Sequence, residues 1–148
     1  MSLLAQLSQL AGPLQERDQE TTKVLNCVEG KLAAMNLDLE VWLTDDPLIT
    51  ESVMVDGKRY RLSRVMGFGR VGEQSLLLAR EIMTCPQDGE DAAPMVLRVC
   101  PPQPLRLLSR ELRVRAIGKL DALVAAMLGH ARDLIEIFDK GRKEQKSC

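Results

Sequence analysis

The chain contains few of the residues from which metal sites are built. It has one histidine, His130, and four cysteines with no short spacing between them, at positions 27, 85, 100 and 148. Zinc sites usually combine cysteines and histidines only a few residues apart, so we expect neither a metal site nor a cofactor. Widely spaced cysteines also favour a reducing, cytoplasmic setting in which thiols stay free.

Aromatic residues and net charge are also scarce. Aromatics make up 3% of the 148 residues, and the formal net charge is -1. Proteins that bind nucleic acid usually carry a basic surface, so nucleic acid is a disfavoured partner. The sequence has no apolar run of about 18 residues or more, and no basic amino-terminal segment precedes an apolar one. We therefore expect no contact with a membrane and no secretion signal.

Motifs typical of enzymes are missing or stand in the wrong context. Residues 67–72 read G-F-G-R-V-G, which matches the G-x-G-x-x-G motif of dinucleotide-binding folds. That motif opens a helix, whereas residues 73–84 have the pattern of a strand, so we interpret these glycines as a turn within a twisted hairpin. Asp133 follows His130 at a spacing typical of a surface contact. We predict no catalytic or cofactor-binding residue.

Apolar periodicity, by contrast, is strong at both ends of the chain. Residues 109–140 carry apolar side chains every three or four positions, which predicts a long amphipathic helix with Ser109 as its N-cap. Gly141 is expected to end this helix and to leave residues 141–148 as a loose tail. Residues 3–35 predict a second long helix with heptad-like spacing.

A Gly12-Pro13 pair interrupts the first helical pattern. Proline has no N–H for the helical ladder, so a kink or a break is expected at this point. Residues 1–12 would then form a separate helical arm or pack on the domain as a short helix of their own.

Between the two helices the period changes to two. Alternating apolar and polar residues predict strands at 39–43, 50–55, 59–71, 74–84 and 95–99. Asp56-Gly57 is a strong two-residue hairpin signal, and the polar residues 86–94 predict a loop. The chain is therefore expected to form a single α+β domain over residues 1–148. Its antiparallel sheet of four or five strands is covered by long N-terminal and C-terminal helices in two layers.

Four apolar residues are candidates for a protein interface. Leu3, Leu7 and Leu10 form one stripe before the Gly12-Pro13 pair. Trp42 points to the opposite side of its strand from Val41 and Leu43, so it either covers the second face of the sheet or anchors a partner. We therefore expect a non-enzymatic protein–protein interaction module or adaptor, which binds another protein or a second copy of itself.

Basic residues near the start of the final helix support an alternative function. Arg106, Arg110 and Arg113 fall roughly on one helical face and could bind an anion such as a nucleotide. Residues 101–148 contain 10 basic and 6 acidic groups, whereas residues 1–50 contain 3 basic and 8 acidic groups. The more usual role of such arginines is a solvated face or pairing with the acidic first helix. Nucleic-acid binding through the final helix is a lower alternative.

Four short stretches resemble a family of small uncharacterised bacterial proteins. They are NLDLEVWL at 36–43, MGFGR at 66–70, LLLARE at 76–81 and SRELRVR at 109–115. In this chain Ser109 takes the place of the family's proline, and Phe68 and Arg70 take those of its aromatic and basic residues. The resemblance implies a helix–sheet–helix plan and a bacterial cytoplasmic origin. No activity accompanies the family, so no catalytic residue is carried over.

Overall fold

The computed structural model describes residues 2–86 and 93–146 as long helices and one sheet. The chain begins with helix α1, Leu3–Ala34. The strands follow in the order β1 Val41–Trp42, β2 Ile49–Val55, β3 Lys58–Val71, β4 Gln74–Cys85, β5 Met95–Val99 and β6 Gln103–Pro104. The chain then forms a 3-10 turn at Leu105–Leu107, helix α2 at Arg110–Ile117 and helix α3 at Leu120–Lys146.

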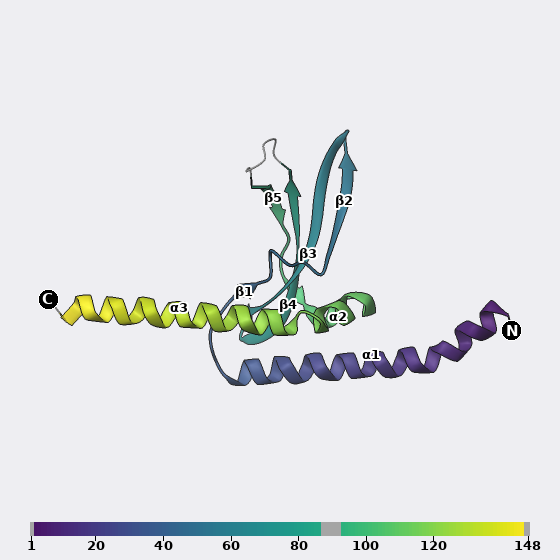
Figure 1. The fold of residues 1–148 in the computed structure, drawn as a ribbon, viewed down its shortest axis with the longest axis horizontal. Coiled ribbons are helices and arrows are strands. Elements are labelled where there is room, and N and C mark those ends of the chain that lie inside the picture. The colour runs from purple at the N-terminus through teal and green to yellow at the C-terminus, as the bar shows by residue number, and fades with distance from the viewer. Residues whose placement is uncertain (1, 87–92, 147–148) are drawn as a thin grey trace.

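All strand pairs in the sheet are antiparallel. The main order is β1-β3-β4-β5, with β2 also paired to β3 and β6 paired to β4. The sheet curls, and the far ends of the β2–β3 and β4–β5 hairpins project away from the helices (Figure 1). The α+β class and the helix-on-sheet plan expected from the sequence are confirmed. Two of the six strands are only two residues long, and one of them replaces the strand predicted at 39–43.

Turn residues lie where the glycine and aspartate pattern indicated. Asp56 and Gly57 have φ angles of 50° and 79°, which fit the left-handed conformation that a two-residue hairpin requires. Gly72, at φ 64°, joins β3 to β4, while Gly67 and Gly69 lie inside β3. The interpretation of the G-x-G-x-x-G stretch as a hairpin is therefore confirmed.

Both predictions about the C-terminal helix need correction. The segment is two helices, because α2 ends at Ile117 and a turn through Gly118 precedes α3. Gly141 does not end the second helix, which continues to Lys146, so the predicted loose tail is helical; residues 147–148 lie outside the described part. Glycine lowers helix propensity by only about 1 kcal/mol, and good helix formers surround Gly141.

Of the kink or break predicted at Gly12-Pro13, the structure shows a bent helix and no break (Figure 1). Helix α1 runs through Pro13 without interruption, and the Arg17 guanidinium donates a hydrogen bond to the Pro13 carbonyl at 3.1 Å. The first turns bend away from the main axis (Figure 1). Asn36, at φ 51°, turns the chain after the helix. The predicted loop at 86–94 falls largely on residues 87–92, outside the described residues.

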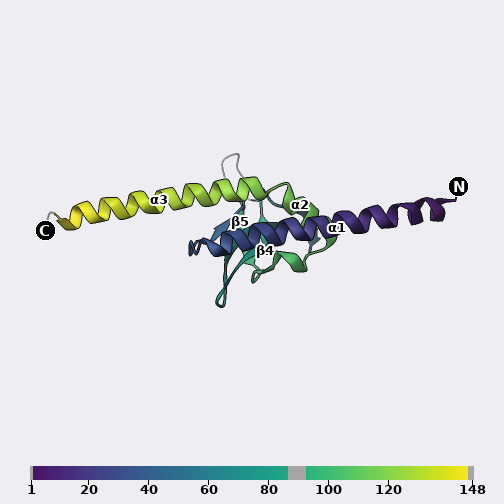
Figure 2. The same ribbon diagram turned by 90° about the horizontal axis from the view of Figure 1, so that it is seen from below.

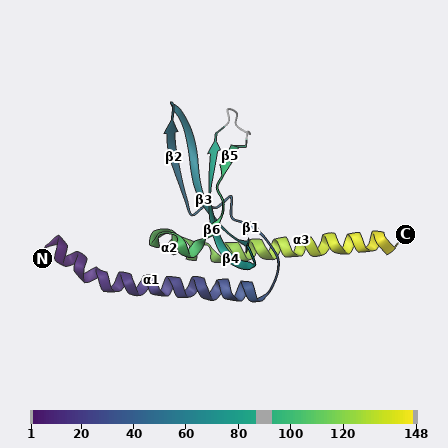
Figure 3. The same ribbon diagram turned by 180° about the vertical axis from the view of Figure 1, so that it is seen from behind.

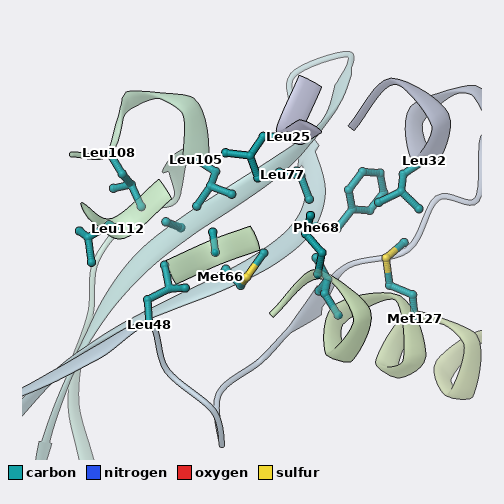
Figure 4. Packing of buried hydrophobic residues seen from close by; sticks show 14 residues of the cluster. Leu25, Leu32, Leu48, Met66, Phe68, Leu77, Leu105, Leu108, Leu112 and Met127 are labelled. Atoms are coloured by element: carbon teal, nitrogen blue, oxygen red, sulfur yellow. The ribbon is translucent and has the colours of Figure 1, made fainter. Parts of the chain in front are cut away.

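The hydrophobic core lies where the near end of the sheet meets all three helices. Met66, Phe68 and Leu77 from the sheet are at most 2% exposed (Figure 4). The helices, the 3-10 turn and the loops add Leu25, Leu32, Leu48, Leu105, Leu108, Leu112, Ala116, Leu120, Leu123 and Met127. Buried residues of α1 begin at Thr21 and those of α3 end at Met127, so about half of α1 and more than two thirds of α3 extend past the core.

Helix α1 is also joined to the sheet by a polar contact. The half-buried Glu29 carboxylate accepts a hydrogen bond from the backbone N–H of Leu77 at 2.9 Å. Strand β6 pairs with Leu78 and Ala79 but does not reach Leu77. Glu29 thus satisfies a buried backbone donor at the end of a short strand.

Replacing Glu29 by alanine is expected to lower the free energy of unfolding by about 1–2 kcal/mol, because the Leu77 N–H loses its acceptor. Glu29→Gln keeps an acceptor oxygen and should cost less than half as much. Urea denaturation measures both variants, with Glu20→Ala on the exposed side of α1 as the control. Equal losses in Glu29→Ala and Glu20→Ala would show that this hydrogen bond does not stabilise the fold.

Candidate protein interface

The buried side of α1 continues toward the N-terminus as an exposed apolar stripe. Leu3, Leu7, Leu10 and Leu14 lie on the same side of the helix as the buried Leu25, by their steps of three and four residues. They are between 45% and 83% exposed. This end of α1 runs past the sheet and past α2, with no other described element beside it (Figures 1 and 3). We call residues 3–14 the α1 arm.

A groove separates the base of the α1 arm from the start of α2. It has a volume of about 480 Å³. Its lining comprises Leu7, Ala11, Leu14, Gln15, Asp18, Gln19 and Arg110. Apolar side chains therefore come from the arm, while charged groups lie at the end nearest the body of the protein. An apolar centre with a polar rim is the usual composition of a protein interface.

Arg113 fixes α1 to α2 at the end of this groove. Its Nη2 atom lies 3.0 Å from Asp18 Oδ1, and the two side chains are only 17% and 23% exposed. The same guanidinium donates to Thr22 Oγ1 at 2.9 Å and to the Leu108 carbonyl at 3.2 Å. Arg110 lies farther out, with its Nε 3.7 Å from Asp18 Oδ2. Arg113 thus holds α1 in the orientation that makes the arm project.

The three predicted anion-binding arginines do not line one site. Arg110 and Arg113 pair with Asp18 of the acidic first helix. Arg106 lines a separate depression, together with Arg70 and Glu29. Two of the three arginines therefore have a carboxylate partner within the fold. Binding of an anion or nucleotide stays a prediction.

Trp42 lies against the second face of the sheet. Its ring covers Gly67, and the Arg80 guanidinium lies 4.1 Å from the ring centroid. The indole N–H donates to Glu40 Oε1 at 2.9 Å. Trp42 is half-buried, so part of the ring still faces outward. Of the two roles considered for this residue, covering the sheet is the one that these contacts favour.

The remaining candidate residues do not come together into a site. His130 is exposed on α3. Within residues 2–86 and 93–146, no three histidine, cysteine, aspartate or glutamate side chains are placed to share a metal ion. Over the same residues, no helix combines the length and the apolar character needed to cross a membrane.

Two exposed apolar surfaces were not predicted from the sequence. Strand β5 lies at an edge of the sheet, and all five of its residues are exposed. Residues 128–145 of α3 are exposed as well, apart from the half-buried Ala131. The amphipathic pattern of the last helix was visible in the sequence. The sequence does not show that the sheet ends before this helix does, which leaves the apolar side of α3 exposed.

No protein-family model, curated protein or solved structure matches this chain. The resemblance to a bacterial family and the cytoplasmic setting therefore stay predictions.

Proposed function

We propose that this protein is a non-enzymatic interaction module, or adaptor, that binds a partner protein along the α1 arm. The observation that carries the proposal is the exposed leucine stripe at the start of α1. The side of α1 that packs on the core at Leu25 and Leu32 carries Asp18 and Thr21 beside α2 and is apolar again from Leu14 to Leu3, where no other described element covers it. A contiguous apolar patch of this kind is typical of an interaction site.

The composition of the arm indicates what kind of partner fits it. Residues 3–15 contain no charged residue, and the positions flanking the leucines are mainly glutamine, serine and alanine. A partner would therefore contribute an apolar helix or strand with uncharged flanks, as in helix-in-groove recognition. Because charge plays little part, binding should depend only weakly on salt.

Replacing Leu7 and Leu10 together by glutamate should weaken binding of the partner at least about thirtyfold, because two charges would enter an apolar contact. The fold should keep its melting temperature, since both side chains are more than half exposed. Native mass spectrometry of the tagged protein, recovered from its own cells at low salt, reads the heteromeric mass directly.

The matched control is Gln9→Glu, which places a negative charge on the opposite side of the same helix. A stoichiometric complex that persists in Gln9→Glu and disappears in the leucine variant supports the proposal. Deletion of residues 1–12 should have the same effect while the domain remains folded. If the deletion instead lowers the mass of a homo-oligomer, the arm serves self-association and the proposed partner site is wrong.

A further inference from the structure

The C-terminal two thirds of α3 carries a second apolar surface, at the opposite end of the molecule from the α1 arm (Figures 1 and 2). We call residues 128–145 the α3 overhang. Five of its side chains are between 44% and 66% exposed, namely Leu128, Leu134, Ile135, Ile137 and Phe138. The overhang runs beyond the sheet with no other described element alongside it.

One line of residues along the overhang has the spacing of a helix–helix contact. Steps of four and three residues connect Val124, Leu128, Ala131, Ile135 and Phe138. A seam of this spacing packs on a neighbouring helix in knobs-into-holes fashion. The seam lies beside the buried line of Leu120, Leu123 and Met127, and Val124 is already 42% exposed where α3 still contacts the body. A second helix therefore has access to the whole seam.

We propose that two copies of this chain pair through their α3 overhangs, antiparallel to each other, about a two-fold axis near Ile135. In this register Ile135 meets the partner subunit's Ile135, residues 131–138 of the two seams face each other, and Leu128 lies opposite the partner subunit's Arg142. The small Ala131 lies opposite the partner subunit's Phe138. Such alternation of small and large side chains lets two helices approach closely.

Charge supports the antiparallel direction. Arg132 and Asp139 lie on the same flank of the seam, by their spacing of seven residues. In the proposed register Arg132 lies beside the partner subunit's Asp139, and the two-fold axis repeats the pair. A parallel pairing in register would instead place this flank beside the partner subunit's Met127 and the partner subunit's Leu134, which carry no charge. The antiparallel arrangement also aligns the two helix dipoles favourably.

The proposed dimer uses a surface separate from the α1 arm, so this inference does not rest on the proposed function. Both α1 arms would remain accessible, one at each outer end of the dimer. The two contacts should also respond differently to salt. Pairing of the overhangs relies partly on charged flanks and should weaken as salt rises, whereas binding to the arm should not.

Charge reversal tests the register. Arg132→Glu and Asp139→Arg should each raise the dimer dissociation constant about tenfold, because each places like charges side by side twice per dimer. The double variant Arg132→Glu/Asp139→Arg recreates the opposite-charge pairs and should return to within about threefold of the unchanged protein. Sedimentation equilibrium from about 1 to about 200 µM measures these constants.

The matched control is Lys140→Glu, which makes the same change of charge on the side of α3 away from the seam. It should dimerise like the unchanged protein, and circular dichroism should show equal helix content in all variants. The proposed pairing would be wrong if the unchanged protein stayed monomeric over the whole concentration range. It would also be wrong if the double variant had a dimer dissociation constant as high as those of the single variants. Retention of the heteromeric complex by Arg132→Glu would show that the α1 arm acts independently.

Discussion

Replacing Gly67 by alanine should lower the free energy of unfolding by about 3 kcal/mol, although it adds only one methyl group. A Cβ atom at this position would lie 2.5 Å from the Val41 carbonyl oxygen and 2.6 Å from the Trp42 ring. Neither group can move easily, because Val41 and Trp42 form β1 and pair with Phe68 and Gly67 of β3. The methyl group would push β1 away from the sheet.

Urea denaturation monitored by the fluorescence of Trp42 measures this loss directly. The control is Gly129→Ala in α3, where no atom lies within 4 Å of the added methyl group. That variant should be neutral or more stable by up to about 1 kcal/mol, since alanine is the better helix former. A Gly67→Ala protein as stable as Gly129→Ala would mean that β1 does not pack on β3 as described.

Replacing Arg113 by alanine should cost about 2–3 kcal/mol of stability, because it leaves a mostly buried carboxylate without its partner. Asp18, Thr22 and the Leu108 carbonyl all lose a contact with the guanidinium. Arg113→Lys should recover only part of the loss, since an ammonium group cannot span the three acceptors. The change should also loosen the angle between α1 and α2, and with it the direction of the α1 arm.

Arg110→Ala is the matched control, because Arg110 faces the same carboxylate of Asp18 from a half-exposed position at 3.7 Å. It should cost less than about 1 kcal/mol, as exposed ion pairs do. A double-mutant cycle with Asp18→Ala separates the Arg113–Asp18 coupling from the other contacts of the arginine. If Arg113→Ala proves no more damaging than Arg110→Ala, the buried pair is not what holds the two helices together.

Features that depend on residues close together in the sequence were predictable. Asp56-Gly57 adopts the left-handed conformation that a short hairpin needs, and the strand pattern of 59–71 matches β3 almost residue for residue. Predictions from single breaker residues were less successful. Pro13 and Gly141 lie inside helices, because one unfavourable position is outweighed by many helix-forming neighbours. Asp38, at φ 50°, interrupts the extended chain and shortens the strand predicted at 39–43.

The candidate surfaces depend on how elements that are far apart in the chain are placed relative to one another, which the sequence pattern does not show. The leucine stripe of α1 was visible, but its exposure follows from a helix of 32 residues, about 48 Å long, lying on a smaller core. The pairing of Arg113 with Asp18 joins residues far apart in the chain, and could be predicted only as one of two alternatives. The close approach of Trp42 to Gly67 depends on strand register, which no local pattern specifies.

The far end of the β2–β3 hairpin has a further consequence for the energetics of the fold. The core cluster includes Met66, Phe68, Leu77 and Ala79, but none of residues 58–62. Cross-strand pairing and half-buried side chains such as Val53 and Tyr60 hold the β2–β3 end, without a share in the core cluster. Its local opening free energy should therefore lie well below that of global unfolding. The β2–β3 end can therefore fray, bend or accumulate substitutions while the centre of the molecule keeps its structure.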